Sequence, residues 1–257
     1  MKYFNIEKFD NTGIVKTFMI PKDQGRWRIY SHDVEADMED LKYYKELGEH
    51  FGVKPENMVR VPQGHSTNIM LVKKEDAGSG VVRMEIDGKC DGAITNEKGV
   101  MLLTIESDCT PVYILDPVKK TIGMVHSGWR GTVGKITQNA INMMIENYGN
   151  DKKDLLIHFG PSICGKCYEV GMDLIPEFKK ILECDEVHKV FVPIIDKPEK
   201  FLLDVTEGIR LSLLKYGIRE ENMTRSEYCT YHSGIFNSWR LEKDRTKQML
   251  TGIMLSK

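Results

Sequence analysis

Several features that would assign this sequence to a special class are missing. Only six of its 257 residues are cysteine, far fewer than a disulfide-stapled mini-protein carries. Its 36 basic and 38 acidic residues nearly cancel, whereas proteins that follow a nucleic-acid backbone usually have a basic surplus. No stretch approaches the roughly 18 consecutive apolar residues of a membrane span. We therefore expect no nucleic-acid partner, no membrane partner and no obligate protein partner.

What the chain does have is enough apolar material for a core. Hydrophobic residues make up 41% of it, which is too many for a disordered chain. The first residues lack the basic, apolar and small-residue order of a secretion signal, so we expect a cytoplasmic protein. Thiols stay reduced there. The cysteines are therefore interpreted as core residues, metal ligands or reactive thiols; they are Cys90, Cys109, Cys164, Cys167, Cys184 and Cys229.

No repeat, linker or low-complexity segment divides the chain, so a single domain over residues 1–257 is expected. Apolar and β-branched runs predict strands at Ile14–Ile20, Met58–Val61, Ile69–Val72, Val81–Ile86, Val100–Ile105, Val112–Leu115, Ile122–Val125, Leu155–Phe159, Met223–Tyr228 and Leu250–Leu255. Helical spacing and capping residues predict helices at Asp37–Phe51, from Thr132 to Gly149, at Asp173–Leu182 and from Asp204 to Tyr216. This irregular alternation indicates an α/β or α+β fold with a mixed sheet.

Three potential metal ligands follow predicted strands. Cys109 and His126 each lie just past the end of one, and His65 follows another. Loops at strand ends gather polar side chains over a rigid base. Two imidazoles and a thiolate suit Zn²⁺ and leave a fourth position open. The gaps of 44 and 17 residues match no zinc-finger pattern. On spacing alone, a histidine or cysteine at a strand end is more often a packed core residue than a metal ligand.

Longer motifs contain two of these residues. The segment Asp108-Cys109 is followed by Val125-His-Ser-Gly-Trp-Arg-Gly131 and by Gly160-Pro-Ser-Ile-Cys-Gly-Lys-Cys-Tyr-Glu-Val170. Together with Asp91-Gly92, Cys229-Thr230 and Ser238-Trp-Arg240, these blocks resemble the YfiH-like family, also called the laccase-domain or multicopper polyphenol oxidoreductase family. The resemblance implies a sandwich of mixed β-sheets flanked by helices. It also implies Zn²⁺ held by His65, Cys109 and His126, which would be the catalytic residues as well.

The resemblance further implies purine nucleoside chemistry: phosphorolysis of adenosine, guanosine, inosine and methylthioadenosine, together with adenosine deamination. An older family label is phenol oxidation by copper, so copper is the alternative cofactor. The trinuclear centre of a multicopper oxidase needs several His-x-His pairs, and the seven histidines here form none. Two further alternatives stay open. One is a metal-free hydrolase with Cys109 as nucleophile and His126 as base, and the other is a module that binds purines or a metal without turnover.

Phosphorolysis needs a cation for the phosphate. Arg130 is the first candidate and Arg240 the second, with a helix start after Thr132 adding backbone donors. For Arg130 a surface ion pair is the alternative. Trp129 either packs against the sheet or stacks on a purine. Asp108 either orients His126 or caps a turn.

The remaining positions are assigned to the core or to packing, or they differ from the pattern of the family. His158 is expected to be a hydrogen-bonded core residue, and Cys90, Cys184 and Cys229 to serve packing. Cys164 and Cys167 have the spacing of a redox pair or of half a zinc knuckle. The family has Gly where Ser66 stands, and Cys where Lys166 stands. Its Arg-Gly-Gly-Val-Ser segment is missing, with Gln24–His32 occupying that region.

Overall fold

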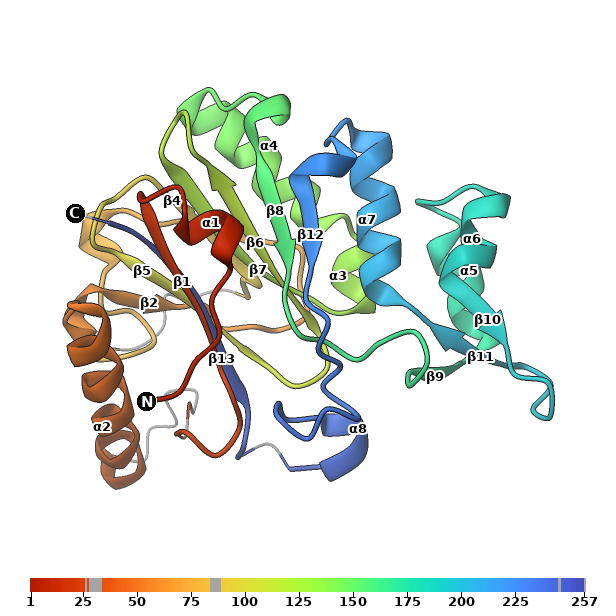
Figure 1. Cartoon of the computed structure of the whole chain (residues 1–257), viewed down its shortest axis with the longest axis horizontal. Helices are drawn as coiled ribbons and strands as arrows, with labels where there is room; N and C mark the ends of the chain where they lie inside the picture. The colour runs from red at the N-terminus through yellow and green to blue at the C-terminus, as the bar shows by residue number, and fades with distance from the viewer. Residues whose placement is uncertain (26, 28–33, 84–88, 245, 257) are drawn as a thin grey trace.

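The computed structural model describes residues 1–25, 27, 34–83, 89–244 and 246–256, with residues 34–38 described by their backbone alone. Two mixed β-sheets pack face to face, and helices cover their outer faces (Figure 1). The predicted α/β class with mixed sheets is confirmed. No helix in these residues has both the length and the apolar character needed to cross a membrane.

The first sheet has four strands in the order β1-β13-β5-β2. Strand β13 is antiparallel to both of its neighbours, and β2 is parallel to β5. The predicted runs at Ile14–Ile20, Met58–Val61, Val100–Ile105 and Leu250–Leu255 correspond to strands β1 (Val15–Ile20), β2 (Met58–Arg60), β5 (Met101–Glu106) and β13 (Met249–Leu255). Nearly continuous apolar runs identified the two central strands because both of their faces are covered.

The second sheet has six strands in the order β12-β8-β6-β7-β4-β3. Its edge pairs, β12 with β8 and β3 with β4, are parallel, and the pairs between them are antiparallel. Its strands are β3 (Ile69–Leu71), β4 (Gly92–Thr95), β6 (Thr110–Asp116), β7 (Thr121–Ser127), β8 (Leu156–Phe159) and β12 (Met223–Arg225). The predicted strand at Met223–Tyr228 is therefore shorter than expected, and β4 was not predicted.

Three apolar clusters form the core. One fills the space between the sheets, where Leu102 and Ile253 of the first sheet meet Leu115 and Met124 of the second. Another lies outside the first sheet, under helix α2 (Val34–Phe51). The largest lies outside the second sheet, under α4 (Ile136–Tyr148) and α7 (Val205–Tyr216). Each sheet is therefore buried on both faces.

The helix expected after Thr132 begins earlier and is interrupted. Helix α3 (Trp129–Val133) starts at the N-cap Gly128, and Thr132 lies inside it, donating a hydrogen bond to the Gly128 carbonyl. Lys135 then adopts a left-handed conformation, and α4 begins after it. A helix start after Thr132 is therefore wrong. By contrast, α7 begins at Asp204, whose side chain accepts from the Glu207 amide, and ends at the left-handed Gly217, as predicted.

A small antiparallel sheet, not predicted, lies to one side of the sandwich (Figure 1). It contains β9 (Glu169–Gly171), β10 (Phe191–Pro193) and β11 (Lys200–Leu203), with α5 (Ile175–Phe178) and α6 (Cys184–Val190) nearby. The helix predicted at Asp173–Leu182 is reduced to α5 and a preceding 3-10 turn. The remaining elements are α1 (Glu7–Asp10), α8 (Trp239–Glu242) and further short 3-10 turns.

Two regions named in the sequence analysis include residues that the structure does not describe. The strand predicted at Val81–Ile86 is wrong for its described residues. Val81 and Val82 form a turn, and Arg83 makes only an isolated bridge with Ser79. Residues 84–86 lie outside the described chain. So does most of the Gln24–His32 region.

His158 is the core histidine that the sequence predicts. It lies on β8 with 8% of its surface exposed, and its Nδ1 is 2.8 Å from the hydroxyl of Thr224 on β12. Burial lowers the pKa of His158 from 6.5 to about 4. The imidazole is therefore neutral in the folded chain at neutral pH.

This histidine should make stability fall as the pH drops below about 6.5, because the unfolded chain binds a proton there and the folded chain does not. The loss attributable to His158 is complete near pH 4 and amounts to about 3 kcal/mol. Urea unfolding between pH 7 and 4 should show that the wild type loses more stability than His158→Leu by about this amount. His188→Ala, at an exposed position on α6, should follow the wild type, and equal slopes in all three proteins would contradict the assignment.

Candidate metal centre

The three predicted ligands meet at one end of the sandwich. His65 lies in the loop between β2 and β3, Cys109 in the connection from β5 to β6, and His126 near the end of β7. All three line a cavity of about 730 Å³. The connections that carry His65 and Cys109 pass from the first sheet to the second, and they bring these residues to the end of β7 where His126 lies.

Their donor atoms are close enough to share one ion. The three candidate ligand atoms lie within 4.8 Å of one another, and His65 Nε2 is 3.8 Å from Cys109 Sγ. The rings of His65 and His126 meet edge to face with centroids 5.0 Å apart. Gly128 leaves space beside them, because a Cβ atom at that position would lie 2.9 Å from Cys109 Sγ. Two imidazole nitrogens and a thiolate form a donor set suited to zinc or copper.

Asp91 is the residue that organises this group. Its fully buried carboxylate accepts hydrogen bonds from the backbone amides of Gly64, His65 and Ser66 at 3.1, 2.9 and 2.5 Å. Its Oδ1 also lies 2.9 Å from Nδ1 of His126. The carboxylate therefore holds the His65 loop and leaves Nε2 of His126 available as a donor. The sequence motif contained Asp91, but the spacing gave no sign of this role.

The structure shows how Ser66 fits at the position where the family resemblance implies glycine. His65 is the residue in the left-handed region, with φ of 56°. Ser66 is not among the described residues with positive φ, so it does not need glycine's conformational freedom. Its hydroxyl donates to the carbonyl of Lys89 at 3.0 Å. The loop therefore forms with serine at this position.

Asp108 could orient His126 or cap a turn, and its partners in the structure show what its carboxylate contacts. Its carboxylate accepts from the Thr230 hydroxyl at 2.6 Å and from the Arg240 amide at 2.7 Å. Among the described contacts, the carboxylate that reaches His126 Nδ1 is that of Asp91. Asp108 itself has φ of 88°. It therefore ties the Cys109 connection to the C-terminal segment rather than orienting His126.

The site also shifts the pKa values of its members. Burial alone would raise the pKa of the Cys109 thiol, but His126 and His65 outweigh it and lower the pKa to about 6. Burial would lower the pKa of His126, yet the charges of Glu106 and Cys109 and the Asp91 hydrogen bond raise it well above 6.5. Glu106 is fully buried 3.6 Å from His126 Nε2, and burial raises its pKa to about 8. The Cys109 thiol is therefore more readily ionised than a free cysteine, in a buried group whose members shift one another's pKa values.

Both predicted arginines line the cavity. Arg130 is exposed, lies on α3, and holds its guanidinium 4.3 Å from the ring centre of Trp129. In the described part of the chain no acidic side chain pairs with it. Arg240 donates from Nη1 to the Glu169 carbonyl at 2.7 Å and lies 4.8 Å from the Tyr168 ring centre. Trp129 both packs against the core and lines the cavity.

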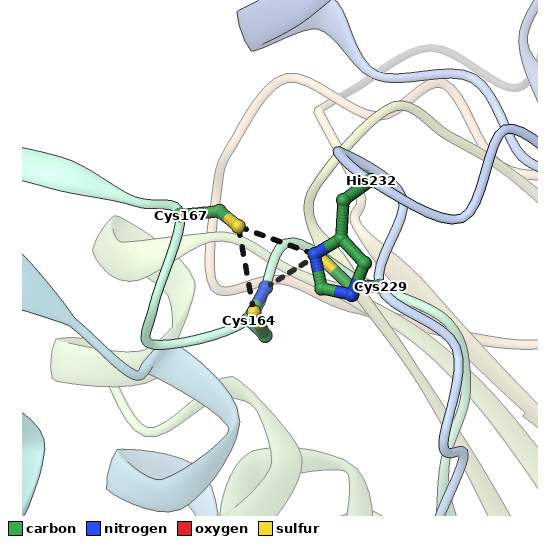
Figure 2. Close-up of side chains that lie close together, drawn as sticks. All are labelled: Cys164, Cys167, Cys229 and His232. Carbon is green, nitrogen blue, oxygen red and sulfur yellow. Dashed lines mark hydrogen bonds between the residues drawn. The ribbon is translucent and has the colours of Figure 1, made fainter.

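The remaining cysteines divide into two groups. Cys164 and Cys167 lie beside Cys229 and His232, with all four donor atoms within 4.8 Å of one another (Figure 2). From the sequence, Cys229 is assigned to packing alone. Its Cys-x-x-His spacing with His232 is the sequence feature that indicates a shared role for these two residues. Cys184 is exposed at the first turn of α6, so its expected packing role is wrong. Cys90 is half-buried.

The fold and the site together define a class of protein: a mixed α/β sandwich with a His-Cys-His donor group in the wall of a cavity. The chain belongs to the family described as multi-copper polyphenol oxidoreductase laccase, whose model matches residues 30–256. The YfiH-like resemblance is thereby confirmed.

Named relatives and solved structures agree with this membership. The purine nucleoside phosphorylase YlmD of Bacillus subtilis is 29% identical over 88% of this chain and 80% of its own length. A purine nucleoside phosphorylase of Bacteroides thetaiotaomicron is 30% identical over 79% and 75%. The adenosine deaminase RL5, from an unknown prokaryotic organism, is 26% identical over 76% and 74%. These are names of enzymes, which supports an enzymatic role here.

Among solved structures, YfiH of Bacillus licheniformis has a TM-score of 0.89 at 25% identity, covering 99% of this chain and 96% of that one. YlmD of Geobacillus stearothermophilus has a TM-score of 0.84 at 26% identity, covering 95% and 92%. The fold is therefore shared along nearly the whole chain.

Proposed function

We propose that this chain is a zinc-dependent purine nucleoside phosphorylase that also deaminates adenosine. Its substrates would be adenosine, inosine, guanosine or methylthioadenosine, with phosphate. The observation that carries the proposal is the His65, Cys109 and His126 group in the wall of a cavity that also contains two arginines. The names of the relatives support the substrate class.

His65, Cys109 and His126 would hold the zinc ion. With three protein ligands, such a site would leave one position open, where the bound ion would supply Lewis acidity. A hydrogen bond from Nδ1 of His126 to Asp91 would leave Nε2 to bind the ion. The low pKa of Cys109, about 6, keeps its sulfur in the thiolate form that a metal requires. The ring of Trp129 and the side chain of Ile163 offer apolar surface for a purine.

In phosphorolysis an oxygen of phosphate forms a bond to C1′ of the ribose while the bond from C1′ to the purine nitrogen breaks. The purine leaves with a proton. The chain's task is to place the phosphate dianion beside C1′ and to exclude water. Arg130 suits this task because its guanidinium lines the cavity without an acidic partner in the described chain. Arg240 is positioned by Glu169 and Tyr168 to help.

Arg130→Met should raise the KM for phosphate about tenfold, equivalent to about 1.4 kcal/mol, because a charge-assisted contact is lost. Methionine keeps an apolar stem against Trp129. Adenosine deamination uses water instead of phosphate, so its rate should stay near that of the wild type. The matched control is Lys135→Met, an exposed cation outside the cavity lining. An unchanged phosphate KM in Arg130→Met would remove this residue from the phosphate site.

The experiment that tests the function separates the products formed from adenosine, inosine or methylthioadenosine, with and without phosphate. Free base with the corresponding sugar 1-phosphate, ribose 1-phosphate or methylthioribose 1-phosphate, supports phosphorolysis, and inosine from adenosine supports deamination. Cys109→Ala is the control. No product above that control would overturn the proposal, and binding of nucleoside without turnover would indicate a binding module instead.

Two alternatives have observations in their favour. The family description favours copper-dependent phenol oxidation, which predicts bound copper and oxygen consumption. The pairing of Asp91 with His126 beside a low-pKa Cys109 favours a cysteine hydrolase. Stoichiometric zinc in the purified protein, together with free base or inosine in the product assay, would argue against both alternatives.

A further inference from the structure

A second group of metal-ligand side chains lies on two loops that leave the second sheet at the same edge. Strands β8 and β12 are parallel neighbours, so the segments that follow them run side by side. The first carries Cys164-Gly-Lys-Cys167, and the second carries Cys229-Thr-Tyr-His232. Each pair has two residues between its donors, which is the spacing of paired ligands in structural zinc sites.

The donor atoms converge on one point (Figure 2). Sγ of Cys164 is 3.7 Å from Sγ of Cys167, and Sγ of Cys167 is 3.3 Å from Nδ1 of His232. The backbone amide of Cys164 donates to Sγ of Cys229 at 3.3 Å, and all four donor atoms lie within 4.8 Å of one another. Zn–S and Zn–N bonds of about 2.3 and 2.0 Å in a tetrahedron place sulfurs about 3.8 Å apart and sulfur about 3.5 Å from nitrogen.

We propose that Cys164, Cys167, Cys229 and His232 bind one zinc ion in a second, structural site. Each thiol would release its proton to solvent on binding, and three thiolates with one imidazole complete a tetrahedral shell. No position remains for water or substrate. The site therefore differs in kind from the group at His65, which has three donors and faces the cavity, and it does not rest on the proposed function.

A redox role for Cys164 and Cys167 alone accounts for less of the geometry. A dithiol pair needs only its two sulfurs. Here Cys229, with 3% of its surface exposed, lies against the pair, and Nδ1 of His232 is directed at Cys167. Four convergent donors are what a metal requires.

The consequence of such a site is a fixed cavity wall. Ile163 precedes the first ligand and Tyr168 follows the second, and both line the cavity. On the other loop, the Thr230 hydroxyl donates to Asp108, next to Cys109. The loops already meet through a bridge between Ser162 and Cys229. An ion bound between the two loops would hold Ile163 and Tyr168 in place as part of the cavity wall.

The test measures zinc in the full-length Cys109→Ala protein, which lacks the thiolate of the cavity site. Purified under reducing conditions with zinc and then freed of excess metal, it should hold about one zinc per chain, against about two in the wild type. X-ray absorption of that zinc should show three sulfur ligands and one nitrogen. A zinc-free protein, or a shell without sulfur, would overturn the proposal.

A second variant guards against misfolding at the buried Cys229. Adding His232→Ala to Cys109→Ala changes an exposed side chain and should weaken zinc at least 100-fold in competition with a chromophoric chelator. The matched addition, His188→Ala, changes another exposed histidine and should leave the affinity unchanged. Equal affinities in the two double variants would contradict the site, as would a Cys164–Cys167 disulfide that forms in place of zinc binding under the same reducing conditions. Neither outcome depends on catalytic activity, so failure here is separate from failure of the proposed function.

Discussion

Asp91→Asn should weaken zinc binding at the cavity site by about 10- to 100-fold and reduce turnover in parallel. Oδ1 of Asp91 faces the amide of His65 and Nδ1 of His126, and Oδ2 faces the amides of Gly64 and Ser66. An asparagine amide has one oxygen and one NH₂ group. In either orientation of the side-chain amide, its NH₂ group faces two donors and can accept from neither. Either His126 and the His65 amide or the amides of Gly64 and Ser66 then lose their acceptor.

The expected cost has two parts. Loss of a carboxylate that orients a metal-bound histidine typically lowers metal affinity by about 10- to 100-fold. Buried donors left without an acceptor cost about 1–3 kcal/mol each, which should appear as a lower melting temperature. Zinc affinity by chelator competition, thermal unfolding and product formation measure the three effects.

Asp116→Asn provides the matched control. Asp116 is also fully buried and accepts from the amides of Val118 and Lys119 and from the side chain of Asn150. It lies at the opposite end of β6 from the cavity. Its substitution should cost similar stability and leave zinc affinity intact. If both variants retain wild-type zinc affinity, Asp91 has no role in holding the ligands.

Gly128→Ala should disrupt the same centre by steric contact. The backbone of Gly128 has φ of −82° and ψ of −178°, which any residue adopts, so the effect comes from the added methyl group. That group would lie 2.9 Å from Cys109 Sγ and 3.3 Å from Cδ2 of His65. Metal sites tolerate displacements of only about 0.5 Å. We expect zinc affinity to fall at least tenfold with little change in the folded structure.

The control for this substitution is Gly64→Ala in the His65 loop. Its added methyl group would meet only the flexible side chain of Lys89, at 3.1 Å. Zinc titration and circular dichroism on both variants separate loss of the site from loss of the fold. Wild-type zinc affinity in Gly128→Ala would contradict the prediction, because it would mean that Cys109 and His65 can move to make room for the methyl group without weakening the site.

Much of the fold was predictable because its central strands are buried on both faces. Strands β5, β6 and β7 appear in the sequence as continuous apolar runs, and the Asp204 and Gly217 caps mark α7. The small sheet gives no such signal, since its strands have three or four residues and β10 exposes two of three. The break before α4 depends on a left-handed Lys135, which no local pattern requires.

The candidate site divides in the same way. His65, Cys109 and His126 were found through motifs that resemble a known family, and the structure brings them together. Asp91 was not assigned, because it lies 26 residues from His65 and 35 from His126 and its role exists only after β4 pairs with β7. The partnership of Cys229 with Cys164 likewise depends on the parallel pairing of β8 with β12.

Two of the three candidate ligands at the cavity come from connections between the two sheets, and this has a mechanical consequence. His65 lies between β2 of the first sheet and β3 of the second, and Cys109 lies between β5 and β6, while His126 belongs to the second sheet alone. Sliding of one sheet over the other is the deformation that separates these donors most directly. An ion bound there would resist this sliding. Substitutions in the core between the sheets would therefore change the distances between the donor atoms even when they contact no cavity residue.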